Sequence, residues 1–339
     1  MVSKIVRPSL LSVRIKLQKF YGELAAVNGV DLSVEQGEIF ALLGPNGAGK
    51  STTVEILEGF RSRDGGEVKV LDTDPAIGGL AARQWRDRIG IVLQSSNDAG
   101  DLTVSESILH FSHYYSNPRD WREVIESVGL GEKANALVRT LSGGQRRRLD
   151  VALGIIGNPE LLFLDEPTTG FDPKARRDFW SLIRTLKSEG RTILLTTHYL
   201  DEAEALADRV AVINKGQIIE VSTPAELGGR ATSLAQVSWR EGGVVRTEKA
   251  PHPTALVAEL SAKFGGEVPE LIVKRATLED IYLEMIGGDD EYREINPSNQ
   301  SFEEDDDGLW VVRKLTGSAA RAHAPFSRTF ASNVAQWRS

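Results

Sequence analysis

The chain contains no cysteine among its 339 residues. Disulfide bonds, thiolate metal sites and cysteine nucleophiles are therefore excluded, and the composition fits a reducing compartment. Long apolar runs are missing as well, because no segment approaches the roughly 18 residues that a membrane-spanning helix needs. Residues 1–8 are interrupted by charge and proline, so they lack the apolar core of a signal peptide. Any work at a membrane is expected to be done through a partner.

A surplus of positive charge is also absent. The formal net charge is −8, which argues against a general nucleic-acid binder. With 41% hydrophobic residues the chain can form a sizeable core, and its length allows two domains at ~150 residues per domain. We expect an ordinary globular protein with no nucleic-acid partner.

A glycine-rich segment follows the apolar residues 39–43 and precedes residues 53–57, which can continue as a helix. Its spacing, G-x-x-x-x-G-K-[ST], is that of a phosphate-binding loop in the required strand–loop–helix context. Its members are Gly44, Pro45, Asn46, Gly47, Ala48, Gly49, Lys50, Ser51 and Thr52. Backbone N–H groups and the helix dipole would bind phosphates, Lys50 would contact the β- and γ-phosphates, and Ser51 would join a Mg²⁺ shell. A glycine-rich turn that merely resembles the loop is the disfavoured alternative, so we predict nucleotide binding.

A second apolar segment, residues 161–164, leads directly into Asp165 and Glu166. Such a run is typical of a buried parallel strand, and ligands collect at the carboxyl ends of these strands in open α/β sheets. Asp165 would hold Mg²⁺ opposite Ser51, directly or through water. Glu166 would polarise the attacking water as a general base. Ordinary solvated acids at a strand end are the weaker alternative.

A third apolar segment, residues 192–197, ends at His198. A lone histidine is usually structural, but this one follows a strand of the same expected sheet, so a γ-phosphate contact is favoured. Between the two strands, residues 178–188 have the apolar spacing of a helix. The strand–helix–strand order predicts the α/β class.

A second anion-binding helix start is possible at Ser142, Gly143, Gly144 and Gln145. Ser142 is a good N-cap, and the residues after Gln145 are strong helix formers. A plain capped helix and an anion site are equally compatible with these four residues alone.

The residues before the phosphate loop alternate between polar and apolar types as strands do. Asn28-Gly29 lies between apolar segments and predicts a hairpin turn. Tyr21 could belong to the core, which composition alone favours, or could stack on a nucleotide base.

The stretch from about Val104 to Leu137 is expected to be mainly helical, with a break near Pro118. Glu106, His110 and His113 could share a helix face as metal ligands. Ordinary surface residues are the favoured interpretation, because nothing nearby supports a metal site.

Together these residues resemble the ATP-binding subunit of an ABC transporter over about residues 12–222. Tyr21 matches the aromatic that stacks on adenine, and residues 44–52 match the Walker A motif. Residues 141–145 match the ABC signature without change, and residues 161–165 match Walker B. The remaining matches are Gln94 at the hinge to a helical subdomain, Glu166 as the catalytic glutamate, Asp172 in the D-loop and His198 as the switch histidine. Phe171 stands where the family usually has leucine, a hydrophobic exchange.

The resemblance implies a P-loop NTPase core with a mostly parallel sheet and flanking helices, an antiparallel β subdomain and a helical subdomain near residues 95–150. It implies that ATP and Mg²⁺ are the cofactors, with Ser51, Gln94 and Asp165 around the metal. It also implies that two subunits pair head to tail, so that Ser142, Gly143, Gly144 and Gln145 contact the ATP of the partner subunit. A homodimer is plausible because both half-sites are intact.

The remainder of the chain narrows the subfamily. Residues 223–287 are expected to form a small α+β accessory domain after the ATPase domain of residues 1–222. Its end, residues 276–287, and Arg146-Arg147-Arg148-Leu149-Asp150 after the signature resemble exporter ATPases of the daunorubicin-resistance type. Export through a separate integral membrane permease, from the cytoplasmic face of the membrane, is then implied. A generic capping helix at residues 276–287 is the alternative.

Residues 288–339 have block charge. Residues 289–307 hold nine acids and one Arg, whereas residues 308–339 hold five Lys or Arg and no acid. Such segments are usually disordered, and we expect a solvated tail.

The rival function is a soluble ABC ATPase in DNA repair or translation control, but one cassette without heptad repeats favours transport. A nucleotide-dependent regulatory subunit without catalysis is a third possibility.

Overall fold

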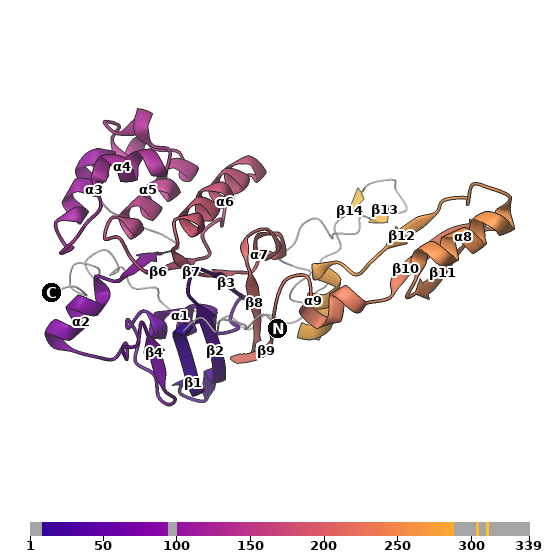
Figure 1. The fold of residues 1–339 in the computed structure, drawn as a ribbon, viewed down its shortest axis with the longest axis horizontal. Helices are drawn as coiled ribbons and strands as arrows, with labels where there is room; N and C mark the ends of the chain where they lie inside the picture. The colour runs from indigo at the N-terminus through magenta and orange to yellow at the C-terminus, as the bar shows by residue number, and fades with distance from the viewer. Residues whose placement is uncertain (1–8, 94–99, 288–302, 305–309, 312–339) are drawn as a thin grey trace, which may run out of the picture.

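The computed structural model describes residues 9–93, 100–287, 303–304 and 310–311 (Figure 1). Gln94 and most of residues 288–339 lie outside these ranges, so the predictions made for them stay untested. The strands are β1 Ser9–Tyr21, β2 Leu24–Glu35, β3 Ile39–Leu43, β4 Val68–Val70, β5 Ile89–Val92, β6 Leu161–Asp165, β7 Thr192–Thr197, β8 Arg209–Asn214, β9 Gln217–Ser222, β10 Ala235–Glu241, β11 Val244–Ala250, β12 Ile272–Lys274, β13 Glu303–Glu304 and β14 Trp310–Val311. The α-helices are α1 Lys50–Leu57, α2 Gly79–Arg86, α3 Val104–Ser112, α4 Trp121–Ser127, α5 Gly143–Ile155, α6 Pro173–Ser188, α7 Leu200–Leu206, α8 Pro253–Phe264 and α9 Leu278–Ile286, and the 3₁₀ turns are η1 Gly131–Lys133, η2 Val138–Thr140 and η3 Leu227–Thr232.

A six-stranded sheet with the order β5-β6-β7-β3-β8-β9 lies at the centre. All its neighbouring strands pair in parallel except β8 and β9, which are antiparallel. Because β3, β6 and β7 run in the same direction side by side, their carboxyl ends meet at one edge of the sheet. The expected α/β class is confirmed, and the three predicted strand-end sites fall on this edge.

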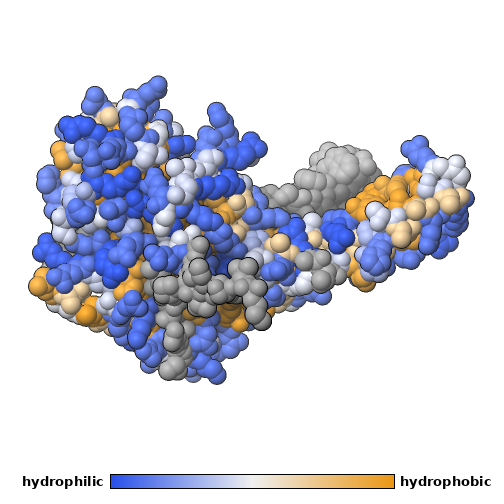
Figure 2. Space-filling model, viewed as in Figure 1, coloured by the Kyte–Doolittle hydropathy of each residue, from blue (hydrophilic) through white to orange (hydrophobic). Residues whose placement is uncertain are grey.

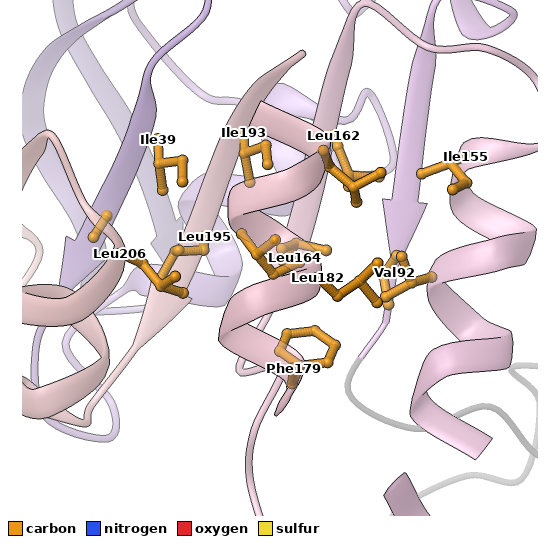
Figure 3. Packing of buried hydrophobic residues seen from close by; sticks show 14 of the residues in the cluster. Ile39, Val92, Ile155, Leu162, Leu164, Phe179, Leu182, Ile193, Leu195 and Leu206 are labelled. Atoms are coloured by element: carbon orange, nitrogen blue, oxygen red, sulfur yellow. The ribbon is translucent and has the colours of Figure 1, made fainter. Parts of the chain in front are cut away.

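Successive side chains of the central strands are buried on opposite faces of the sheet. One face packs against α5, α6 and α7, and Figure 3 shows Leu162, Leu164, Ile193 and Leu195 meeting Phe179 and Leu182. The other face, with Phe40, Phe163 and Leu194 among others, packs against α1 and the antiparallel strands. A sheet buried on both faces explains why these strands are continuous apolar runs rather than alternating ones.

The helices α3, α4 and α5 form a helical region beside the sheet (Figure 1). Its apolar residues, including Ile108, Val124 and Leu149, belong to the same core cluster as the sheet face that packs against α5, α6 and α7. Each of these helices begins at an N-cap residue. Thr103 and Ser142 form reciprocal capping boxes at the starts of α3 and α5, and the Asp120 side chain accepts from the Arg122 backbone N–H at the start of α4. The predicted N-cap at Ser142 is therefore confirmed.

The hairpin predicted at Asn28-Gly29 is wrong. Strand β2 runs through these residues, and the two-residue turn to β1 lies between Tyr21 and Leu24 instead. Gly29 has a positive φ of 82°, the pairing with β1 shifts register here, and the Asn28 N–H bonds to the carbonyl of Gly216. The Asn28-Gly29 pair therefore forms a bulge within β2. The neighbouring strands supply backbone hydrogen-bond partners that a turn at this position would remove.

The residues after β9 divide into an arm and a returning helix. Strands β10, β11 and β12 with α8 form the arm, which projects from the main body in Figure 1, and Figure 2 shows apolar residues gathered on it. The exposed members include Val244, Val245 and Ile272. Strand β11 was not expected from its sequence, because six of its seven residues are exposed. Helix α9 packs back on the main body rather than on the arm: Leu278, Tyr282 and Ile286 belong to the large core cluster.

Within the described ranges, no helix has both the length and the apolar character needed to cross a membrane.

Candidate functional site

The phosphate-binding loop connects β3 to α1, as its sequence predicts. Gly49 stands at the N-cap of α1 with a φ of 101°, and a Cβ there would lie 2.3 Å from the carbonyl oxygen of Ala26. A Cβ at Gly44 would lie 2.3 Å from the carbonyl oxygen of Ile213. Glycine is therefore required at both positions by close backbone packing, and the loop is held between β2 and β8 before any ligand is considered.

Lys50 is buried beneath this loop. Its ammonium donates to the carbonyl oxygens of Gly44, at 2.8 Å, and Pro45, at 3.1 Å, and lies 3.4 Å from Glu166 Oε1. Burial lowers the pKa of Lys50, and the neighbouring Glu166 opposes that shift. The loop therefore presents a fixed cation at the edge of the sheet where β6 ends.

The two carboxylates after β6 lie in different surroundings. Asp165 Oδ1 accepts a hydrogen bond from the Thr196 hydroxyl at 2.5 Å, and burial raises the pKa of Asp165. The same hydroxyl accepts from the Glu166 backbone N–H at 3.0 Å. Thr196 on β7 thus links Asp165, the last residue of β6, and the following Glu166 to the neighbouring strand.

Glu166 has a backbone φ of 42°, which is rare for a residue with a side chain and costs conformational energy. Its Oε2 lies 3.3 Å from His198 Nδ1. The neighbouring His198 imidazole, together with the charge of Lys50, holds the pKa of Glu166 below its ordinary value against the effect of burial. The structure therefore brings Lys50, Glu166 and His198 together from three separate strand ends.

The signature residues lie at the start of α5. Gln145 N–H donates to Ser142 Oγ at 3.4 Å, and Ser142 N–H donates to Gln145 Oε1 at 3.0 Å. A Cβ at Gly143 would meet no atom of the described chain within 4 Å, and one at Gly144 would meet only the Ala175 side chain, at 3.7 Å. Packing within the described chain therefore does not explain why these two residues are glycines.

The structure places Tyr21 at the surface and Asp172 at the start of α6. Tyr21 is 42% exposed, which excludes the core interpretation, and the Lys19 and Arg61 cations lie over its ring at 5.8 and 5.5 Å from the centroid. Asp172 caps α6 by accepting from the backbone N–H groups of Lys174 and Ala175. Tyr21 is accessible to a planar ligand, and Asp172 orders the loop that follows Glu166.

The disfavoured metal site on α3 finds no support. Glu106 caps the helix through Thr103, and His110 contacts Tyr114 Oη at 3.2 Å. In the part of the chain that the structure describes, no group of three His, Asp or Glu residues could hold a metal ion.

Sequence reasoning missed the role of Arg147, two residues after the signature. Its buried guanidinium donates to the carbonyl oxygens of Pro167 at 2.9 Å, of Asp165 at 3.0 Å and of Leu93. One side chain of α5 therefore holds the ends of β5 and β6. The only available signal was the arginine run after the signature, which does not reveal which arginine points inward.

Replacing Arg147 with lysine is expected to lower the free energy of unfolding by about 2–4 kcal/mol, because hydrogen bonds to charged groups contribute about 1.5–3 kcal/mol each and lysine cannot reach three carbonyls at once. Hydrolysis of ATP should fall as well, since Asp165 loses backbone support. Denaturant unfolding and an ATPase assay measure both. The matched control is Arg139→Lys, at an exposed arginine that pairs with Asp101. Equal stability of the two variants would contradict a structural tie through Arg147.

The architecture of a phosphate loop with a cation, two carboxylates and a histidine on one sheet edge defines a P-loop nucleoside triphosphatase. A model of the ABC transporter family matches residues 27–169. The "Nod factor export ATP-binding protein I" of Ralstonia nicotianae is 45% identical in an alignment of 299 residues, and the match covers 80% of this chain and 92% of the relative. The "Daunorubicin/doxorubicin resistance ATP-binding protein" of Streptomyces peucetius is 43% identical over 216 residues, 62% of this chain and 64% of the relative.

A solved structure described as the dimeric post-hydrolysis state of an ATP-binding cassette bound to ADP and Pi is similar in fold. It has a TM-score of 0.56 and 25% identity, and the match covers 63% of this chain and 98% of that chain. The chain therefore belongs to the ABC transporter family. It is a nucleotide-binding ATPase subunit of that family, and the resemblance to the daunorubicin-resistance ATPases is confirmed.

Proposed function

We propose that the chain hydrolyses Mg²⁺-bound ATP as a head-to-tail homodimer and thereby drives export through a separate integral membrane permease. The observation that supports it most is the convergence of Lys50, Glu166 and His198 at one sheet edge, with contacts of 3.4 and 3.3 Å. The names of the export and drug-resistance relatives support the direction of transport. The transported molecule, whether drug-like or lipid-like, would meet the permease rather than this chain.

Each residue of the site has a definite task in this proposal. The backbone of residues 44–52 and Lys50 bind the phosphates, and Tyr21 stacks on adenine. Glu166 accepts a proton from the attacking water, because its side chain is a carboxylate at the end of β6, beside Lys50 and His198. His198 contacts both Glu166 and the γ-phosphate, which orients the water between them.

The residues present suit Mg²⁺. Ser51 is exposed at the start of α1, and Asp165 supplies a carboxylate at the end of β6, so both donors are oxygen atoms, as Mg²⁺ prefers. Among the described residues no group of three His, Asp or Glu side chains could hold a metal ion, so water and phosphate oxygens would complete the shell. The ion would neutralise phosphate charge, and Gln94 is assigned to the same shell by resemblance alone.

The glycines of the signature support the dimer. The space beside Gly143 is open within the described chain, and the N–H groups at the start of α5 form a positive helix end. We assign this end to the nucleotide held by Lys50 of a second copy. The dimer would act at the cytoplasmic face of the membrane, held there by the permease.

Mixing two inactive variants tests the shared site. Lys50→Ala removes the phosphate cation, and Gly143→Asp places an anion where the partner's phosphate is expected. Aspartate fits the open space and is favourable in a first helical turn, so the second variant should fold. Each variant alone should hydrolyse ATP weakly. Their equimolar mixture should recover about one quarter of the wild-type rate, since random pairing makes half of the dimers mixed and each of these has one intact site of two.

Absence of recovery, with both variants folded and able to dimerise, would contradict a site shared between copies. The transport role has a separate test, which is stoichiometric co-purification of the chain with an integral membrane protein. Co-purification with ribosomes or DNA instead would favour the soluble ATPase alternative.

A further inference from the structure

Strand β11 forms one edge of the sheet in the arm, whose strand order is β11-β10-β12. It pairs with β10 over all seven of its residues, it contains no proline, and six of the seven are exposed. Strand β12, at the opposite edge, has only three residues. Proteins usually shorten, twist or cover a long regular edge, because its outward N–H and C=O groups can pair with another strand. Within the described chain, β10 is the only strand that pairs with β11.

The turn before β11 determines which of its backbone groups point outward. Gly242 and Gly243 form a two-residue loop with φ values of 61° and 82°, and Glu241 faces Val244 across it. In such a hairpin the pair that flanks the loop is hydrogen-bonded, and bonded and non-bonded pairs alternate from there along the strands. The residues whose N–H and C=O groups point away from β10 are therefore Val245, Thr247 and Lys249.

A backbone hydrogen bond on the other side of β10 agrees with this assignment. The Arg240 N–H donates to the carbonyl of Pro269 at 2.9 Å, so it points away from β11. Its register partner Val245 therefore belongs to a non-bonded pair and directs its own N–H and C=O outward. The next pair of this kind, Ser238 and Thr247, joins through its two hydroxyl groups at 3.0 Å, as the short separation of a non-bonded pair allows.

The charges of β11 are self-complementary. Arg246 and Glu248 are exposed, flank Thr247 and lie on the same side of the strand. If a second copy of β11 lay antiparallel across a two-fold axis at Thr247, Arg246 of each copy would face Glu248 of the other. Opposite charges directly across two strands are stabilising.

This register is also the one that suits the backbone. The axis at Thr247 pairs this residue with itself and pairs Val245 with Lys249 of the second copy, so outward groups meet outward groups. An axis at Arg246 or at Glu248 would place two like charges directly opposite each other, which is destabilising. Backbone and side chains of β11 therefore favour the same antiparallel register.

From these features we propose that β11 pairs with β11 of a second copy of this chain, which joins two arms into one six-stranded antiparallel sheet. The interface is isologous, since the same residues contribute from both copies. The arm carries none of the residues assigned to the nucleotide, so this pairing does not require ATP. Two copies held in this way would meet in the proposed head-to-tail dimer at a raised effective concentration, and this consequence alone rests on the proposed function.

A single introduced cysteine tests the pairing, because the chain has none of its own. Thr247→Cys in the full-length chain would place two thiols at the axis. Their Cα atoms would be about 5.5 Å apart in a hydrogen-bonded pair, a separation that a disulfide spans. We expect mild oxidation without nucleotide to convert most of this variant to a disulfide-linked dimer on a non-reducing gel.

Val244→Cys is the matched control on the same strand, where Val244 is 58% exposed. In the proposed register Val244 faces Ala250 of the second copy, so two cysteines at position 244 would be ~20 Å apart, at about 3.4 Å per residue. This variant should form little disulfide-linked dimer under the same oxidation. Equal yields from Thr247→Cys and Val244→Cys would overturn the proposal.

Charge reversals in the Thr247→Cys chain test the register. Arg246→Glu and Glu248→Arg each place like charges across the axis and should slow cross-linking on the order of tenfold. The double reversal restores opposite charges and should return the rate to within about twofold. An effect on thiol reactivity alone would have opposite signs in the two single variants, because a cation lowers the thiol pKa and an anion raises it. Thermal unfolding checks that these exposed substitutions leave the fold intact.

Failure of the double reversal to restore cross-linking would overturn the proposed register and the pairing with it. Cross-linking to a membrane partner in place of a second copy would also overturn the proposal. Lys50→Ala separates the two interfaces, since adding it to Thr247→Cys should leave cross-linking unchanged. If Lys50→Ala and Gly143→Asp fail to complement while the arms still cross-link, only the head-to-tail site fails. If they complement while Thr247→Cys stays monomeric, only the pairing of the arms fails.

Discussion

Replacing Glu166 with glutamine is expected to reduce the rate of ATP hydrolysis on the order of 10²–10³-fold, because a positioned general base typically contributes 10²–10⁴. Glutamine has nearly the same shape and can still face Lys50 through its carbonyl oxygen, but it cannot accept a proton from water. Lys50 also keeps its bonds to the carbonyls of Gly44 and Pro45. Binding of ATP should therefore remain, and ATP-bound dimers should accumulate.

An ATPase assay and size-exclusion chromatography in ATP and Mg²⁺ measure these two effects. The control is Glu160→Gln, because Glu160 precedes β6 at its opposite end and pairs with Arg88 at the surface. That variant should hydrolyse ATP normally and show no additional dimer. Hydrolysis at the wild-type rate by Glu166→Gln would remove Glu166 from the role of the base.

The second large effect concerns stability. Tyr282→Ala is expected to lower the free energy of unfolding by about 3–5 kcal/mol, the usual cost of deleting a buried aromatic ring. Tyr282 on α9 is fully buried in the core cluster of the ATPase sheet, together with Leu227, Leu278 and Ile286. Thermal unfolding should shift downwards on the order of 10 °C, at about 2–4 °C per kcal/mol for a chain of this size class.

Two controls make this result specific. Tyr282→Phe keeps the ring and should lose much less stability. Tyr114→Ala removes an aromatic ring that is 39% exposed and should change stability little. If Tyr282→Ala unfolds at the wild-type temperature, α9 does not belong energetically to the ATPase core. The division of the chain at residue 222 stays a prediction, and this experiment bears directly on it.

Sequence patterns correctly predicted the helices, strands and caps whose geometry depends only on residues nearby in the chain. The strand–loop–helix unit around Lys50 and the N-cap at Ser142 need only neighbouring residues for their geometry, and the structure has them where the sequence places them. The apolar spacing of residues 178–188 likewise matches the buried face of α6, including Phe179 and Leu182. Residues 276–287 were matched to the end of an exporter ATPase, with a capping helix as the alternative, and the structure has helix α9 at Leu278–Ile286.

Features that depend on distant partners were missed or wrong. Asn28-Gly29 favours a turn by itself, but the carbonyl of Gly216 and the register of β1 hold it within a strand. Tyr21 looked like a core residue by composition, yet it is exposed at a hairpin tip. The sequence of residues 146–148 does not say which arginine is buried, and only α5 packing against β5 and β6 turns Arg147 inward.

The sequence by itself determined the class of this protein, because a phosphate loop, a signature and two strand-end sites depend on residue type and spacing. It also determined that the strands leading into the phosphate loop and the strand-end sites are buried on both faces, since their apolar runs do not alternate. The tertiary structure alone decided that Glu166 has Lys50 and His198 as neighbours, that the buried Arg147 joins α5 to the ends of β5 and β6, and that α9 packs into the ATPase core. Those contacts join residues far apart in the chain, and a long-range contact is set by the packing of whole elements rather than by the residues next to it in sequence.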